Sequence, residues 1–106
     1  MIYIITGAFM VLDMITGLVK AFAEKNYTSS VMREGLIHKV AEILCVVMAI
    51  LVNEAQNYID LGVTVPIIPA VCGYIILMEI GSNIENLGTV NQGIVPEKIR
   101  SYFKKL

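Results

Sequence analysis

The sequence predicts an all-α membrane protein with three transmembrane helices and a C-terminal amphipathic interfacial helix. Its composition is far from that of a soluble domain: 57% of the 106 residues are hydrophobic and only 16% are charged, against about 45–50% and about 25% in typical soluble domains. The sequence also contains three separate apolar runs near the length of about 20 residues that crossing a bilayer requires. A segment that is both basic and apolar follows the last run.

A chain of this length holds a single domain, residues 1–106. The predicted spans are residues 2–23, 40–59 and 61–80. Within the second span only residues 43–53 are free of charge, and at 1.5 Å per residue this uncharged run covers only about 17 Å. Glu42 or Glu54 must therefore enter the membrane, reach back to its surface or be protonated.

The tail, residues 94–106, is predicted to be a basic amphipathic helix. Its apolar side chains share one face, and the remaining faces carry Lys98, Arg100, Lys104 and Lys105. Such a helix suits the surface of the inner leaflet, where anionic lipids attract cations.

Basic residues predict the topology, because they remain on the cytoplasmic side of a membrane. All eight lie around the first connection or in the tail: Lys20, Lys25, Arg33, Lys39, Lys98, Arg100, Lys104 and Lys105. Three crossings place both groups on the cytoplasmic side, with the N-terminus outside and the C-terminus inside. The net charge of −1 gives no indication of a nucleic-acid partner.

Polar residues recur at helical spacing within each predicted span, so each span has one polar face. The candidate assembly or pore-lining residues are Asp13, Thr16, Gly17, Lys20, Glu42, Asn53, Glu79, Ser82, Asn83 and Asn86. Such residues turn away from lipid. They either pack inside one bundle, which the periodicity alone favours, or meet between copies and line an aqueous hole. Because three spans can shelter little polar surface, the pattern also indicates self-association.

Asp13 allows several interpretations. It is either an ion- or proton-coupling carboxylate, as in small transporters, or a neutral acid that is hydrogen-bonded to a neighbour. Lys20 lies two helical turns away, too far for a pair within the helix, whereas Lys39 on the next helix is a possible partner. The sequence does not choose between these interpretations.

No residue pattern predicts an enzyme, a metal site or a cofactor. A Ser/His/Asp set, a metal-ligand cluster and a phosphate-binding glycine loop are all missing from the sequence. Cys45 and Cys72 each lie inside an apolar run, where we expect them to pack as small hydrophobes. His38 is expected to be an interfacial residue at the membrane edge.

Several motifs resemble one known family. The run LDMITGLVKA at residues 12–21 is similar to the "L-D-x-x-T-G-x-x-K-A" opening of a family of bacteriophage holins, which includes clostridial toxin-release proteins. Further similarity follows in order along the chain: Ser29-Ser30, Gly35 and Lys39 in the first connection, EIGSNIEN at residues 79–86, and Val95-Pro96 before the tail. Asn83 departs from the pattern, because an apolar residue is common there.

The resemblance implies a phage- or prophage-encoded protein of the bacterial inner membrane that has no active site. Such proteins assemble with copies of themselves into lesions that release endolysin, or in some relatives a toxin, and thereby lyse the host cell. Membrane lipids and other copies are the implied contacts, and no direct binding of endolysin follows. The alternatives are a small proton-coupled transporter, although the sequence lacks a fourth apolar run and tryptophan, and a structural membrane subunit.

Overall fold

The structure, a computed structural model, describes residues 1–106 except 26–27, 63, 92, 94–95 and 106. Its helices are α1 (Ile2–Glu24), α2 (Ser29–Ala55), α3 (Ile67–Val90) and α4 (Glu97–Lys104). The first three are long and apolar enough to cross a membrane by length and composition. Among the described residues there is no strand, so the predicted all-α fold with three long helices and a short C-terminal one is confirmed.

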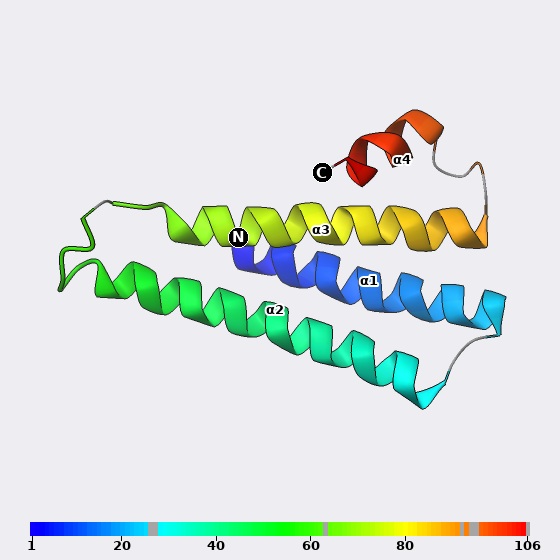
Figure 1. The fold of residues 1–106 in the computed structure, drawn as a ribbon, viewed down its shortest axis with the longest axis horizontal. Coiled ribbons are helices and arrows are strands. Elements are labelled where there is room, and N and C mark those ends of the chain that lie inside the picture. Colours follow the sequence, from blue (N-terminus) through cyan, green and yellow to red (C-terminus); the bar gives the residue numbers. More distant parts are fainter. Residues whose placement is uncertain (26–27, 63, 92, 94–95, 106) are drawn as a thin grey trace.

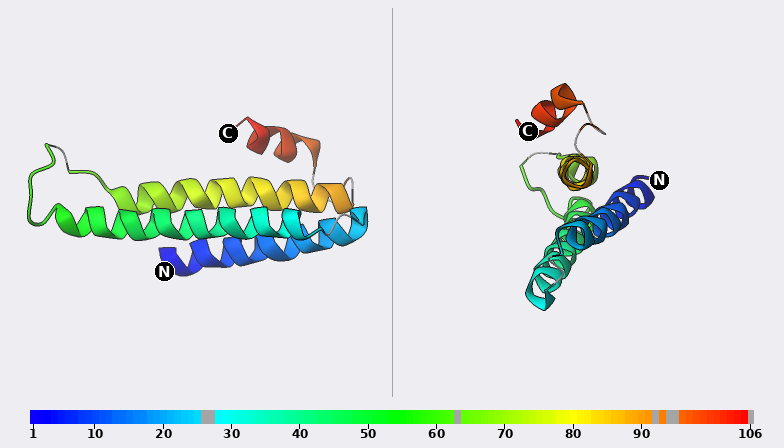
Figure 2. Two further views of the ribbon diagram at one scale, coloured as in Figure 1. Left: turned by 60° about the horizontal axis from the view of Figure 1, so that its bottom comes forward. Right: turned by 90° about the vertical axis from the view of Figure 1, so that its right-hand side faces the viewer.

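The three long helices lie side by side along the long axis of the molecule, and each runs opposite to the one before it (Figure 1). The α1–α2 and α3–α4 connections lie at one end, and the α2–α3 connection lies at the other (Figures 1 and 2). Helix α3 is central, because it contacts each of the other three helices, whereas α1 and α2 make few direct contacts with each other.

Two helices begin and end away from the predicted spans. Helix α2 starts at Ser29, ahead of the predicted span, because the hydroxyl of Thr28 caps it by accepting a 3.4 Å hydrogen bond from the backbone N–H of Val31. Helix α3 starts after Pro66 and continues to Val90 rather than to residue 80. Hydropathy locates apolar runs, whereas caps and prolines set helix ends, so polar residues beyond each run stay helical.

Polar side chains fill much of the space between the helices, and apolar side chains cover the outside. Most large apolar residues of the long helices are exposed, and the buried apolar residues are Met10, Ala49, Cys72 and Ile75. The buried polar residues are Thr6, Thr16, Lys39, Glu42, Glu79 and Asn83. A soluble protein would reverse this distribution, but lipid tails solvate the apolar exterior of a membrane protein, and its helices associate through close packing and polar contacts.

The two cysteines differ in their surroundings. Cys72 on α3 is completely buried, as predicted for a packing residue. Cys45 on α2 is exposed, so the prediction that it is a packing residue was wrong. An apolar run surrounds both residues in sequence, but α2 contacts its neighbours along one narrow stripe, and Cys45 lies outside that stripe.

Helix α4 folds back along the last turns of α3 (Figure 2). A Cβ atom at Gly88 would lie 3.0 Å from Cζ of Arg100, so the missing side chain leaves room for the guanidinium. About two turns earlier on the same face of α3, a Cβ at Gly81 would lie 3.9 Å from Cβ of Phe103. These two close approaches position α4.

We expect Gly88→Val to displace Arg100 and detach α4, because the valine methyl groups would occupy the position of the guanidinium. Limited proteolysis of the protein in detergent micelles would then cleave the 91–105 segment faster than in the wild type. Gly73→Val is the matched control, because nothing lies within 4 Å of a Cβ at that position. Equal cleavage rates in both variants would contradict this account of α4 packing.

Candidate functional site

The candidate site is a set of polar residues that three helices share, here called the polar cluster. Its members are Asp13 and Thr16 on α1, Lys39 and Glu42 on α2, and Glu79, Asn83 and Asn86 on α3. Residues three, four or seven positions apart share one face of a helix, so each helix presents its members together. Asp13 and Glu79 lie near the midpoints of α1 and α3.

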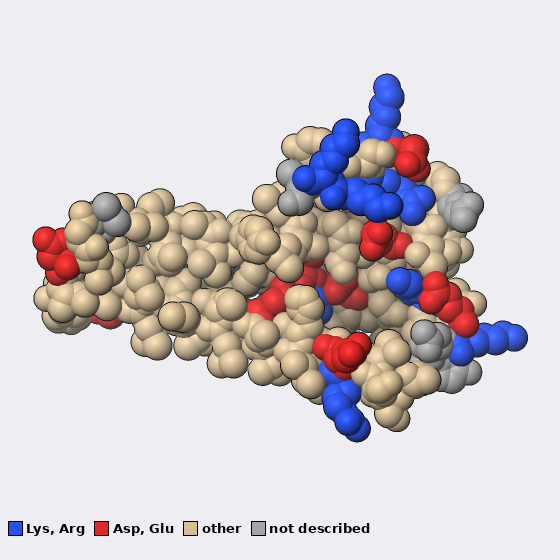
Figure 3. All heavy atoms as spheres, in the orientation of Figure 1, with Lys and Arg blue, Asp and Glu red and all other residues tan. Residues whose placement is uncertain are grey.

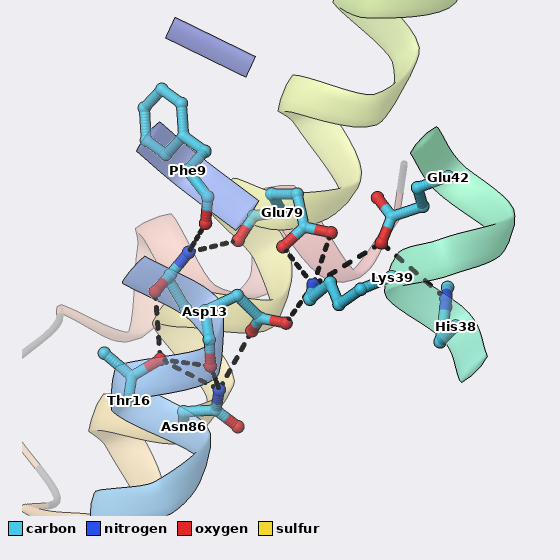
Figure 4. A network of polar contacts seen from close by, with 9 residues as sticks. Phe9, Asp13, Thr16, His38, Lys39, Glu42, Glu79 and Asn86 are labelled. Atoms are coloured by element: carbon cyan, nitrogen blue, oxygen red, sulfur yellow. Dashed lines mark hydrogen bonds and ion pairs between the residues drawn. The ribbon is translucent and has the colours of Figure 1, made fainter. Parts of the chain in front are cut away.

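Lys39 is the centre of the cluster (Figure 4). Its Nζ donates to Oδ2 of Asp13 at 2.6 Å and lies 2.7 Å from both Oε1 and Oε2 of Glu79. Oε1 of Glu42, one turn further along α2, is 3.4 Å away. One ammonium group thereby joins α2 to both α1 and α3. Charge-assisted hydrogen bonds of this kind are about twice as strong as neutral ones.

Amides and a hydroxyl extend the cluster on the side of α1 and α3 (Figure 4). Nδ2 of Asn86 donates to Oδ1 of Asp13 at 3.0 Å and to Oγ1 of Thr16 at 3.0 Å. The Thr16 hydroxyl in turn donates to Oδ1 of Asn83 at 2.9 Å, and Nδ2 of Asn83 donates to the backbone carbonyl of Glu79 at 2.7 Å. These contacts join α1 to α3 over two turns.

The charged members are almost entirely enclosed. The exposed fractions of their side chains are 10% for Lys39, 14% for Asp13, 6% for Glu42 and 4% for Glu79. With all four ionised, one positive and three negative charges would leave a net charge of −2. On the face shown in Figure 3, charged side chains gather towards the end that holds α4, and a wide uncharged surface separates them from the acidic side chains at the α2–α3 connection.

Glu42 has the least complete set of hydrogen bonds in the polar cluster. Its Oε2 is buried and has no hydrogen-bond partner within the described chain. Oε1 lies 3.7 Å from Nδ1 of His38, which is itself largely exposed. A buried acceptor without a partner costs about 1–3 kcal/mol.

We therefore expect Glu42→Gln to stabilise the protein by about 1 kcal/mol, because it removes a buried, incompletely paired carboxylate and can add a donor. The free energy of unfolding in detergent micelles, followed by circular dichroism, measures this change. Glu34→Gln is the control, because Glu34 lies on the exposed part of the same helix. Destabilisation of Glu42→Gln beyond the control would contradict the assignment.

The structure brings together six of the ten residues that the sequence singled out: Asp13, Thr16, Glu42, Glu79, Asn83 and Asn86. Gly17 lies beside them, since a Cβ there would be 3.7 Å from Nδ2 of Asn86. Lys20 makes no ion pair among the described residues. Asn53 and Ser82 are exposed outside the cluster.

The sequence predicted Lys39 to be a basic residue near the first connection and a possible partner of Asp13, but not the centre of the polar cluster. Its position three residues before Glu42, on the same helical face, was the available signal. Of the four tail bases, Lys98, Lys104 and Lys105 are exposed, and Arg100 is half-buried against Gly88. No group of three or more His, Cys, Asp or Glu side chains in the described chain could hold a metal ion.

Comparison with known proteins places the chain in context. The family described as the bacteriophage holin family matches residues 1–106, the whole chain. No curated protein and no solved structure matches it.

Proposed function

Because the chain belongs to the bacteriophage holin family, we propose that it oligomerises in the inner membrane of a bacterial host and forms lesions that release endolysin, or a toxin, and lyse the cell. Family membership and three apolar helices indicate a multi-pass membrane protein of a pore-forming rather than an enzymatic family. In the proposed topology the N-terminus is outside and the C-terminus is cytoplasmic. The basic side chains around α4 and the α1–α2 connection, which gather towards one end in Figure 3, support this topology.

The observation that carries the proposal is the enclosure of the polar cluster within one copy. Lys39 and its three carboxylate partners are hidden between helices, while the lipid-facing surface is apolar. A single copy is thus compatible with an intact bilayer. The polar side chains needed to line a wet hole are nevertheless present in every copy.

Helix α2 is the element that we propose moves. It makes few direct contacts with α1, and its buried residues are Lys39, Glu42 and Ala49. Its attachment therefore depends strongly on the polar cluster. When copies become crowded, polar residues of a neighbouring copy compete for Lys39, so that concentration shifts the population from closed copies to an assembled, open form. The exposed Asn53 and Ser82 add polar contacts between copies.

Timed expression in bacteria tests the lytic function. With a co-expressed endolysin we expect a sudden fall in culture density and release of cytoplasmic protein, and without endolysin we expect loss of membrane potential without cell-wall breakdown. A culture that keeps growing with an intact membrane at high expression, even after an energy poison, would contradict the proposal.

The exposed Cys45 provides a built-in probe of assembly, because Cys72 is buried and protected. A membrane-permeant bismaleimide should link Cys45 between copies into dimers as lysis begins, and Cys45→Ser should abolish the product. A second probe, Asn53→Cys in the Cys45→Ser background, samples the same helix two turns away. Monomers throughout lysis with both probes would contradict assembly through α2.

A further inference from the structure

A groove of about 760 Å³ lies between α3 and α4. Its volume falls within the range of about 300–1,000 Å³ that is typical of small-molecule sites. The α3 wall begins with the apolar side chains of Tyr74, Leu77 and Met78 and ends at Glu85. The α4 wall contributes both apolar and basic side chains, among them Arg100 and Lys104. The polar cluster lies on another side of α3 and is not part of this groove.

The lining changes from apolar to charged along α3. From Tyr74 to Glu85 the helix rises about 16 Å at 1.5 Å per residue. On α3 the charged end, at Glu85, is the one nearer the α3–α4 connection, and Arg100 of α4 lies near this end, because a Cβ atom at Gly88 would be 3.0 Å from its Cζ. This order, with hydrocarbon at mid-membrane depth and charge towards the surface, is the order of groups along a phospholipid.

The charged side chains that line the groove are two basic and two acidic ones. Arg100 and Lys104 are positive, and Glu85 and Glu97 are negative. None of the four forms an ion pair with another among the residues that the structure describes. Glu97 Oε1 accepts a 3.4 Å hydrogen bond from the Ser101 hydroxyl, which leaves its other oxygen for a ligand. A headgroup with only negative charge would neutralise Arg100 and Lys104 but would leave Glu85 and Glu97 without a positive partner.

We propose that this groove binds a phospholipid whose headgroup carries a phosphate and a primary ammonium, that is, a phosphatidylethanolamine. The phosphate lies between Arg100 and Lys104, the ammonium donates to Glu85, and an acyl chain lies along Leu77 and Met78. The bound lipid holds α4 against α3 at the membrane surface. This inference requires insertion of the chain into a membrane but not lesion formation.

Lipid retention by the purified full-length chain tests the proposal. The protein in detergent micelles is mixed with equal amounts of phosphatidylethanolamine, phosphatidylglycerol and phosphatidylcholine of matched acyl chains, and retained lipid is counted by native mass spectrometry. We expect about a threefold to fivefold preference for phosphatidylethanolamine, the size of one partly exposed ion pair. Phosphatidylcholine, whose quaternary ammonium has no N–H donor, should be retained less.

Variants identify the residues involved. Glu85→Gln should bring retention of phosphatidylethanolamine and phosphatidylglycerol to equality, and Arg100→Gln should reduce retention of both. Lys105→Gln, at the residue that follows α4 and outside the groove lining, should change neither. Equal or greater retention of phosphatidylglycerol by the wild type, or an unchanged preference in Glu85→Gln, would overturn the assignment. Because retention is measured without cells, a failure here is distinct from a failure to lyse.

Discussion

Lys39→Met is expected to loosen α2 from the other helices and to lower the free energy of unfolding by about 3–5 kcal/mol, the cost of removing one partner from a buried ionic group. Methionine fills a similar volume, but it leaves Asp13, Glu42 and Glu79 without their shared cation. Denaturation in mixed micelles, followed by circular dichroism, measures the loss. In cells, we expect the variant to lyse at a lower accumulated amount of protein.

Two further substitutions distinguish the effect of the Lys39 charge from the effect of its side-chain shape. Lys20→Met removes a basic residue that has no ion pair in the described chain, so it should change stability by less than about 0.5 kcal/mol. Lys39→Arg keeps the charge but replaces a compact ammonium with a planar guanidinium, so its stability should fall between wild type and Lys39→Met. Stability of Lys39→Met equal to that of Lys20→Met would show that Lys39 does not hold the helices together.

Asp13→Ala is expected to produce the next largest effect, a loss of about 3 kcal/mol, because the carboxylate accepts from both Lys39 at 2.6 Å and Asn86 at 3.0 Å. Hydrogen bonds to charged groups contribute about 1.5–3 kcal/mol each. The same unfolding measurement applies. Glu24→Ala, at the exposed end of the same helix, is the control.

Asp13→Asn also distinguishes the proposed function from proton-coupled transport. The amide keeps one acceptor oxygen for Lys39 or Asn86, so a holin with this substitution should still lyse cells, at a shifted time. A coupled transporter would lose uptake altogether, because an amide does not exchange protons. Loss of substrate uptake with no change in lysis would favour the transporter.

Hydropathy predicted the existence and order of the helices but not their ends. Apolar composition marks the run from residue 61, yet residues 61–62 and 64–65 are not helical, and α3 begins after Pro66. At the other end, Glu85 and Gly88 are too polar or too small to register as membrane-spanning, but they remain helical because backbone hydrogen bonding continues through them. The apolar run in the sequence and the helix α3 in the structure therefore begin and end at different residues.

The polar faces were visible in the sequence because helical periodicity is a local property. The rotation of each helix about its axis and the angles at which the helices cross decide which polar faces meet. A local sequence pattern does not determine either quantity. The periodicity therefore indicated that Asp13 and Glu79 turn inward, but the convergence of both on Lys39 required the three-dimensional arrangement. Asn53 satisfies the same periodicity and is nevertheless exposed, because the covered stripe of α2 passes through Ala49 and Val52 and Asn53 lies beside it.

The central place of α3 has a consequence for biogenesis. This helix supplies Glu79, Asn83 and Asn86 and contacts all the others, but it is synthesised after both α1 and α2. Until it emerges from the ribosome, Asp13 and Glu42 are the cluster carboxylates within reach of Lys39, and Thr16 lacks the amides of Asn83 and Asn86. We expect the α1–α2 hairpin to stay at the translocon until α3 arrives, because α3 supplies the remaining partners of the polar cluster and the three helices can then enter the bilayer together.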